Sequence, residues 1–189
     1  MDGSSWESSV RLVGVSDRHR GAAEEFVRER FAAAFGAQVR ELMPNLLVSF
    51  DEHGKLAACV GYRAAGHSPL FLEQYLDRPI EAELGARFDT TIDRRRIVEI
   101  GHFSGLDAGR GRRLIAPLLT HLARNELDWL VFTATRSLRN LFMRLQLQPV
   151  PLAAARASSV AAPETWGRYY DDEPWVMGGP LSWSRGLGA

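Results

Sequence analysis

Apolar and polar positions along the chain repeat with two different periods, and each period predicts a type of element. From residue 97 onward the pattern predicts a strand at Ile97–Phe103, a glycine–arginine turn at Leu106–Arg113, an amphipathic helix to about Arg124, a strand at Trp129–Ala134 and a helix through Leu145. A strand that leads through a glycine turn into a helix favours anion binding, because the N–H groups of the turn converge at the positive end of the helix. A phosphate-bearing cofactor is therefore the first hypothesis for this segment.

The first half of the chain predicts a strand, a helix and a hairpin, followed by two short helical stretches. These elements are a strand at Val10–Val15, a helix at Ala22–Phe35, hairpin strands at Leu46–Phe50 and Leu56–Arg63, and helical stretches at Leu70–Leu76 and from Ile80 to about Arg87. Beyond Leu147 the chain is rich in proline and alanine, and its final stretch carries an aromatic block, Trp166–Tyr170, before an end rich in Gly, Ser and Pro. Residues 1–9 and about 180–189 are expected to be loosely ordered.

The composition is that of an ordinary globular chain, and it narrows the possible functions. The 189 residues are 46% hydrophobic and 24% charged with zero formal net charge, which predicts one domain and argues against binding to nucleic acid. No apolar run reaches the roughly 20 residues that a membrane-spanning helix needs, and the N-terminal region has no signal-peptide core. The single cysteine, Cys59, lies in an apolar stretch and is expected to be a buried thiol. We therefore expect a cytoplasmic protein without integral membrane association.

The order of the predicted elements resembles the GNAT-type N-acyltransferase fold. The resemblance implies an α/β domain over residues 1–189, with a mixed, twisted sheet flanked by helices. In that fold two neighbouring parallel strands splay apart and admit the pantetheine arm of an acyl donor. By this resemblance Ile97–Phe103 and Trp129–Ala134 are the splayed strands, and Leu106–Arg113 is the turn that cradles the pyrophosphate of coenzyme A.

Four separate blocks of sequence are similar, in the same order, to blocks of the thermostable hemolysin family. They are Phe71–Asp77, Val98–Gly101, Val131–Thr135 and Trp166–Asp171. The name of that family implies lysis of red cells. A fainter similarity connects the chain to acyl-homoserine-lactone synthases, which share the GNAT-like core and take their acyl chain from an acyl carrier protein. In those synthases a Glu on the first splayed strand is followed three residues later by Arg, whereas here Glu99 is followed at that spacing by His102.

Three positions depart from the GNAT pattern. Leu106 stands where the turn usually begins with Gln or Arg, Gln146 replaces a common glycine, and Phe142 stands where the fold often carries a tyrosine general acid. These departures leave open the hypothesis of a catalytically silent module that binds a carrier protein.

Acyl transfer from a thioester to an amine requires a base for the amine and a hydrogen-bond donor for the carbonyl. Glu99 is the candidate base, because it is the only carboxylate in an otherwise apolar strand, where burial raises a carboxyl pKa. The alternative is a structural Glu that pairs with an arginine. His102 is the second candidate, since the pKa of imidazole is near neutrality. Strand alternation points His102 away from the face of Glu99 unless a bulge intervenes.

The resemblance assigns donor binding to the end of this strand and to the turn. The backbone N–H groups of the strand from Ile100 and Gly101 to Phe103 would bind pantetheine. The candidates for binding phosphate are Gly109, Arg110, Gly111, Arg112 and Arg113. Three arginines at the positive end of a helix are unfavourable unless an anion compensates them, which favours phosphate over a solvated basic surface. The same arginines could instead contact the phosphopantetheine and the acidic surface of a carrier protein.

A short polar helical stretch is the candidate border of the acceptor or acyl pocket. Its members are Phe71, Glu73, Gln74, Tyr75 and Asp77. Glu73 and Asp77 are four residues apart and so share a helical face, which either holds the ammonium group of an acceptor or is simply solvated. The aromatic residues Trp166, Tyr169 and Tyr170 either form a lid or pack over the core. No Cys, His, Asp and Glu set has the spacing of a metal site.

The sequence therefore predicts an N-acyltransferase. Its donor would be acyl-CoA or the acyl-phosphopantetheine of an acyl carrier protein, and its acceptor the amine of a small, amino-acid-like molecule. Two alternatives remain: a membrane-active hemolysin, for which the sequence offers no long amphipathic surface helix, and the silent carrier-binding module.

Overall fold

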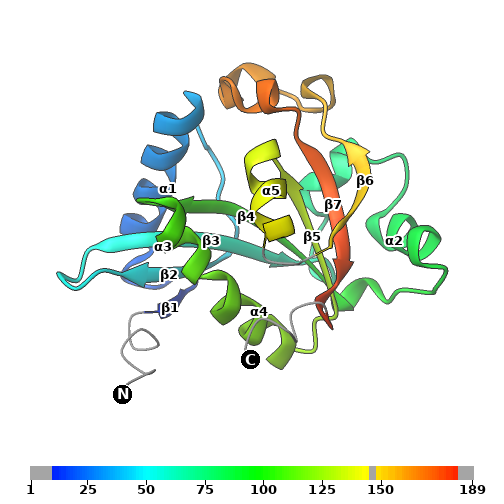
Figure 1. The fold of residues 1–189 in the computed structure, drawn as a ribbon, viewed down its shortest axis with the longest axis horizontal. Helices are drawn as coiled ribbons and strands as arrows, with labels where there is room; N and C mark the ends of the chain where they lie inside the picture. Colours follow the sequence, from blue (N-terminus) through cyan, green and yellow to red (C-terminus); the bar gives the residue numbers. More distant parts are fainter. Residues whose placement is uncertain (1–9, 145–147, 183–189) are drawn as a thin grey trace.

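A seven-stranded sheet organises the chain in the computed structural model, which describes residues 10–144 and 148–182 (Figure 1). The strands are β1 Val10–Val13, β2 Asn45–Phe50, β3 Leu56–Ala64, β4 Ile97–Gly105, β5 Trp129–Ala134, β6 Val150–Ala154 and β7 Trp175–Pro180. Their order is β1-β2-β3-β4-β5-β7-β6, and every neighbouring pair is antiparallel except β4 and β5. The helices are α1 Arg20–Phe35, α2 Ile80–Phe88, α3 Ala108–Arg113, α4 Ile115–Arg124 and α5 Arg136–Arg144. Short 3₁₀ turns join them, among them η2 Phe71–Tyr75, η5 Pro163–Trp166 and η6 Tyr169–Asp172.

Most of the predicted elements are confirmed, with shifts at their ends. The hairpin forms as β2 and β3, and the helices predicted in the first half are α1 and α2. Three predictions need correction. The first strand ends at Val13, the stretch before Leu76 is a 3₁₀ turn, and the helix after the glycine turn is two helices that meet at Leu114.

The sequence does not predict β6 and β7, because proline in β6 and glycine and proline in β7 interrupt the strand pattern. Gly178 in β7 shows why such a residue stands there. A Cβ at this position would lie 2.9 Å from Leu84 Cδ2 and 3.1 Å from Val131 Cγ1, so close packing requires glycine. The expectation of loose order from about residue 180 is wrong for Pro180, which belongs to β7, and for Leu181, which is buried. Residues 1–9 and 183–189 lie outside the described residues.

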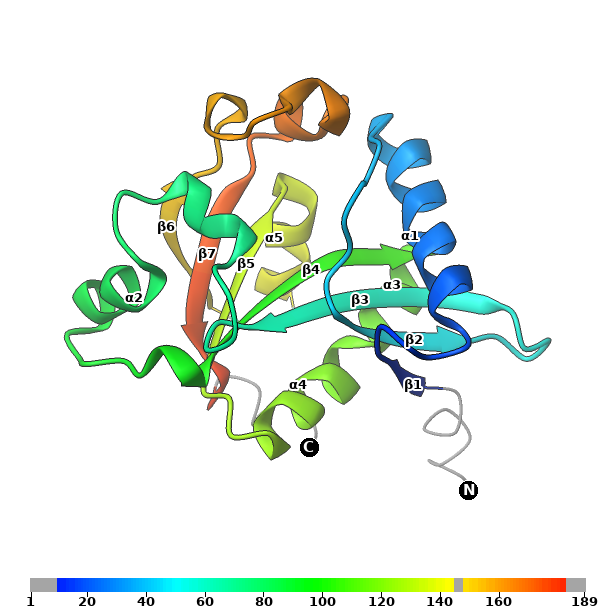
Figure 2. The same ribbon diagram turned by 180° about the vertical axis from the view of Figure 1, so that it is seen from behind.

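Helices cover both faces of the sheet (Figures 1 and 2). On one face, α4 and α5 pack against every second residue of the central strands, including Val98 and Phe132. On the opposite face, α1 packs against β1, β2 and β3. There η2 and α2 pack against Ile97 and Val131. This alternation places Glu99 on the face that α1 and η2 cover, because it is two residues from Ile97.

The two central parallel strands separate halfway along their length. β4 and β5 pair only from Ile97 opposite Trp129 to Ile100 opposite Phe132. Beyond this point β4 continues along β3 while β5 continues along β7, so the two strands diverge (Figure 2). The predicted GNAT-like sheet with two splayed parallel strands is confirmed.

Candidate active site

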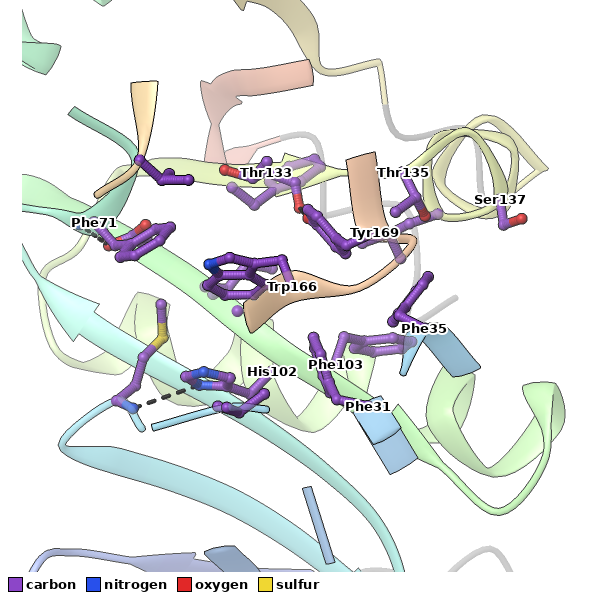
Figure 3. Close-up of a pocket in the computed structure, with 18 of the residues that line it drawn as sticks. Phe31, Phe35, Phe71, His102, Phe103, Thr133, Thr135, Ser137, Trp166 and Tyr169 are labelled. Atoms are coloured by element: carbon purple, nitrogen blue, oxygen red, sulfur yellow. Dashed lines mark hydrogen bonds between the residues drawn. The ribbon is translucent and has the colours of Figure 1, made fainter. Parts of the chain in front are cut away.

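A cavity of about 940 Å³ lies where β4 and β5 separate. Its walls come from the end of α1, residues 38–43, η2, the two splayed strands, α5, and residues 160–169, which we call the roof segment. Phe31, Phe35 and Phe103 gather at one end and Phe71 lies at the other, with the ring of Trp166 between the two strands (Figure 3). Aromatic rings thus form much of the wall, and polar side chains border the cavity from β3, β4, β5, α5 and residues 38–41.

Glu99 is the buried acid of this cavity, with only 2% of its surface exposed. Its two carboxylate oxygens accept the backbone N–H groups of Phe71 at 2.9 Å and Leu72 at 3.0 Å, so it also holds the start of η2 against the sheet. Burial raises the pKa of Glu99 to about 7, although these two hydrogen bonds and the charge of Arg63 oppose the rise. At neutral pH the carboxyl group is therefore poised to take up a proton.

A β-bulge in β4 brings His102 to the same cavity. Cys59 pairs with Ser104 and Gly61 pairs with Gly101, so three steps along β4 match two steps along β3. The extra residue places His102 at a φ of +53°. Simple alternation would turn its side chain away from the face of Glu99, and the bulge corrects that expectation: both side chains line the cavity.

The surroundings of His102 fix its protonation state. Its Nδ1 accepts the backbone N–H of Met43 at 3.4 Å, and its ring lies edge-on to Phe31 (Figure 3). Burial, with smaller effects from the charges of Arg63 and Arg20, lowers the pKa of His102 to about 4. The imidazole is therefore neutral at pH 7. An Nδ1 that accepts this hydrogen bond favours the tautomer with the proton on Nε2, in which Nε2 is a hydrogen-bond donor.

The predicted pantetheine groups line the cavity along β4. Ile100, Gly101 and Phe103 all border it together with His102. Past Ile100 the edge of β4 that faces β5 has no strand partner among the described residues. Its backbone polar groups are therefore open to a bound molecule, because a peptide group without a strand partner bonds to solvent or ligand.

The predicted phosphate turn meets the cavity through Asp107 and Gly111 and not through its arginines. Gly111 lines the cavity, as does Asp107. The Asp107 carboxylate accepts the N–H of Arg110 at 2.8 Å and lies 3.3 Å from the guanidinium of that residue. The anion at this helix start is therefore the chain's own Asp107.

The three arginines of the turn occupy the last turn of the six-residue helix α3, which corrects the expectation that they crowd the start of a long helix. Arg110 also lies 4.0 Å from Asp51. Arg112 and Arg113 are exposed, and neither has a carboxylate within ion-pair distance in the described part of the chain. Gly109 is the second residue of α3 and is exposed. Any contact of Arg112 and Arg113 with a ligand would be made outside the cavity.

The predicted acidic face for an acceptor does not exist. Glu73 accepts two hydrogen bonds from Arg94, at 2.6 and 2.7 Å, and also the backbone N–H groups of Leu70 and Ile80. The Arg94 guanidinium holds the pKa of Glu73 at about 2. Asp77 lies beyond the end of η2 and is exposed. Glu73 thus anchors η2, while Phe71 and Tyr75 of the same stretch do line the cavity.

Further residues border the cavity from other segments. Trp166 and Tyr169, for which the sequence leaves a lid and core packing as alternatives, line it from the roof segment and pack against each other. Arg63 on β3 borders it directly opposite Glu99. Thr133 also lines it, and its buried Oγ1 has no hydrogen-bond partner among the described residues. These residues are brought together only by tertiary packing, because they are distant from Glu99 in sequence.

Phe142 is part of the wall rather than a proton donor. It is buried and its ring lies 4.7 Å from that of Phe132, at an angle of 48°. In the described ranges no group of three or more His, Cys, Asp or Glu side chains could hold a metal ion. Nor does the described part of the chain contain a helix with the length and apolar character needed to cross a membrane.

Solved structures share this fold at low sequence identity. FeeM, an N-acyl amino acid synthase from uncultured soil microbes, matches with a TM-score of 0.62 and 17% identity over 93% of this chain and 97% of its own. The AHL synthase LasI matches with a TM-score of 0.62 and 11% identity over 91% and 89% of the two chains. A GCN5-related N-acetyltransferase from Kribbella flavida matches with a TM-score of 0.53 and 13% identity over 92% and 99%. These likenesses establish the GNAT-like fold.

No curated protein matches the sequence. The family model described as thermostable hemolysin matches residues 13–184, which is nearly the whole chain. The blocks around Phe71, Glu99, Val131 and Trp166, on which the resemblance rests, all fall within this match and all contribute to the cavity or its support. The chain belongs to the thermostable hemolysin family.

Proposed function

We propose that this protein is an N-acyltransferase, which moves an acyl group from the phosphopantetheine thioester of coenzyme A or of an acyl carrier protein to the amine of a small acceptor. The observation that carries the proposal is the buried carboxyl of Glu99 at the point where β4 and β5 open into an apolar cavity. The similar folds of FeeM, named as an N-acyl amino acid synthase, and of LasI, named as an AHL synthase, support the same activity.

In this proposal Glu99 removes a proton from the attacking amine, directly or through a water molecule. A general base is most effective when its pKa lies near the working pH, and burial raises the pKa of Glu99 to about 7. The amine nitrogen attacks the thioester carbonyl, the carbon–sulfur bond breaks, and the thiolate leaves and takes up a proton. The products are an amide and the free thiol of the carrier.

His102 and the open edge of β4 would stabilise the developing oxyanion. A neutral imidazole with its proton on Nε2 donates a hydrogen bond without adding a charge to be desolvated. The bulge turns this donor toward the cavity. The pantetheine arm would lie along the edge of β4 beyond Ile100, with the phosphate end beside Gly111 and with Arg112 and Arg113 as the available cations.

The direct test mixes the pure protein with acyl-coenzyme-A, acyl carrier protein and a pool of small amines, and follows free thiol and new amides by mass spectrometry. We expect both products in equal amounts from wild type. Removal of Glu99 should abolish both together. A folded wild-type protein that releases no thiol with any donor would refute the proposal.

The family name suggests lysis, and the assay can separate lysis from transfer. If lysis is a property of the protein itself, the pure chain should release dye from liposomes without any thioester. If an acylated, detergent-like product causes lysis, leakage should require donor and amine and should disappear after dialysis of the reaction mixture. Binding of an acyl carrier protein without consumption of its acyl group would instead indicate a silent module.

A further inference from the structure

Arg63 is the cationic side chain on the sheet beside the proposed base. It lies on β3 directly opposite Glu99 in the antiparallel pair of β3 and β4, so the two side chains share one face of the sheet. Both line the cavity, together with His102. The positive charge of Arg63 also acts on the titration of both Glu99 and His102, which places the guanidinium at this end of the cavity independently of the lining.

The hydrogen-bonding capacity of Arg63 is largely unused. Its Nη1 donates to the carbonyl oxygen of Pro69 at 3.3 Å. No carboxylate of the described residues lies within 4.0 Å of the Arg63 guanidinium, so Arg63 forms no ion pair with them. Arg94 differs, since it pairs with both Glu73 and Glu81. An arginine has five N–H donors in a planar fork that matches a carboxylate, so a cavity arginine with open donors is suited to an anionic ligand.

Of the acidic side chains on η2 and on the neighbouring strand β4, Glu99 is the one available to the amine of the acceptor. Glu73 is fully engaged by Arg94 and by backbone N–H groups, and Asp77 lies outside η2 and is exposed. Glu99, by contrast, lines the cavity. A small molecule with an amine near Glu99 would therefore have its other end near Arg63.

We propose that Arg63 binds the carboxylate of the acceptor, so that the acceptor is a free amino acid rather than a neutral amine. The inference rests on the proposed acyl transfer and adds the class of acceptor and the residue that selects it. The amine of the amino acid faces Glu99 and its carboxylate faces Arg63, so the two charges of the zwitterion meet opposite charges on neighbouring strands. Arg63 is thus a substrate-binding residue, and it takes no part in proton transfer.

The test compares amino acids with their amides as acceptors, because the amide keeps the amine and the shape but removes the negative charge. We expect wild type to prefer the acid in kcat/KM by at least tenfold. Arg63→Gln should lower kcat/KM for the acid by ten- to hundredfold, through KM, and leave the amide nearly unchanged. Arg63→Lys should restore part of the preference. Arg87→Gln, at an exposed position outside the cavity, should behave as wild type.

A second measurement does not depend on turnover. Calorimetric titration with an N-acyl amino acid and with its neutral amide should show tighter binding of the acid to wild type, and equal binding of the two to Arg63→Gln. Equal use of acid and amide by wild type, or an equal loss for both in the variant, would overturn the role of Arg63 while leaving acyl transfer intact. Absence of any transfer would refute the proposed function. The titration would then decide by itself whether Arg63 forms a carboxylate site.

Discussion

At the scale of single residues, the structure distinguishes Glu99 from His102, which the sequence alone offers as two candidates for proton transfer. Both border one cavity, Glu99 buried and His102 partly buried, yet loss of solvent moves their pKa values in opposite directions, to about 7 and about 4. Burial disfavours the charged form of each group, which is the protonated form for His and the deprotonated form for Glu. Near neutral pH only Glu99 titrates, so only Glu99 is suited to act as a base.

The pH dependence of acyl transfer should therefore report Glu99. We expect kcat to fall as the pH drops below about 7, because the base becomes protonated there. Glu99→Gln should lower kcat by about 10²–10⁴-fold and remove this acidic limb. His102→Asn, which tolerates the positive φ, should lower kcat but keep the limb. A limb that disappears with His102 and persists without Glu99 would reverse the assignment.

The same raised pKa predicts a stability effect with a defined sign. A carboxyl whose pKa is about 7 when folded and 4.5 when unfolded binds its proton more tightly in the folded state. Its contribution to stability is thus fully present below about pH 4.5 and is lost as the pH rises to about 7. The unfolding free energy of wild type minus that of Glu99→Gln should fall by roughly 3 kcal/mol over this range. Urea denaturation at a series of pH values measures the difference, and a difference that is independent of pH would contradict the buried, titrating Glu99.

At the scale of elements, the roof segment depends on a glycine. Gly167 follows η5 at φ +53° and ψ −123°, where a side chain is strongly disfavoured, and a Cβ there would collide with the carbonyl oxygen of Phe35. The residues that flank this glycine are bonded to the end of α1 and the residues after it. The carbonyl oxygen of Thr165 accepts the N–H of Gln38 at 2.6 Å, and the N–H of Arg168 donates to the carbonyl oxygen of Phe35 at 2.8 Å. Two backbone hydrogen bonds therefore connect the roof segment to the end of α1 and the residues after it, and both lie next to this glycine.

Gly167→Ala should release the roof segment from α1. We expect a loss of about 1–3 kcal/mol in unfolding free energy and weaker binding of acyl donors, since Trp166 and Tyr169 would leave the cavity wall. Gly21→Ala is the matched control, because it lies in α1 with no heavy atom within 4 Å of a new Cβ. It should be neutral or slightly stabilising. Equal effects of the two substitutions on donor binding would show that the roof does not contribute.

The glycine–arginine turn gives a separate prediction about the donor. In the double variant with Arg112→Ala and Arg113→Ala, we expect the affinity for coenzyme A thioesters to fall roughly ten- to hundredfold for each hydrogen bond to phosphate that is removed, about 1.5–3 kcal/mol for a charged hydrogen bond. Arg110 is unsuitable for this test because it pairs with Asp107 and Asp51. Fluorescence or calorimetric titration measures the affinity. Unchanged affinity would show that Arg112 and Arg113 do not bind the phosphate groups of the donor.

The sequence predicts the elements whose signal is local and misses the features that depend on distant partners. The hairpin and the two splayed strands are confirmed because alternation and turn residues lie within a few positions of each other. The bulge at His102 is invisible to alternation, because it exists only relative to the register of β3. Glu73 could not be recognised as structural, since its partner Arg94 is 21 residues away and is brought near only by folding.

At the scale of the whole molecule, the cavity is assembled from segments that are far apart in the chain. The end of α1, η2, the splayed strands, α5 and the roof segment each contribute aromatic or apolar side chains, and no two of these segments form the cavity alone. Apolar surface in such a cavity gains free energy when an apolar ligand replaces water. The acyl chain of the donor is the part that can supply this gain, while coenzyme A itself supplies the polar contacts.

Thermal unfolding can separate these two contributions. A ligand at 100 times its Kd stabilises the folded state by about 2.7 kcal/mol, which corresponds to a rise in Tm of about 5–11 °C for a chain of this size. At equal concentration, long-chain acyl-coenzyme-A should raise the Tm more than free coenzyme A, because the acyl chain fills the aromatic cavity between β4 and β5. Phe71→Ala should reduce this additional rise and leave the effect of coenzyme A unchanged, since its ring lies at the end of the cavity opposite Phe103, and the proposed phosphate end at Gly111 lies beside Phe103 (Figure 3). Equal shifts with the two ligands would mean that the acyl chain remains outside, and the cavity would then have to serve another apolar molecule.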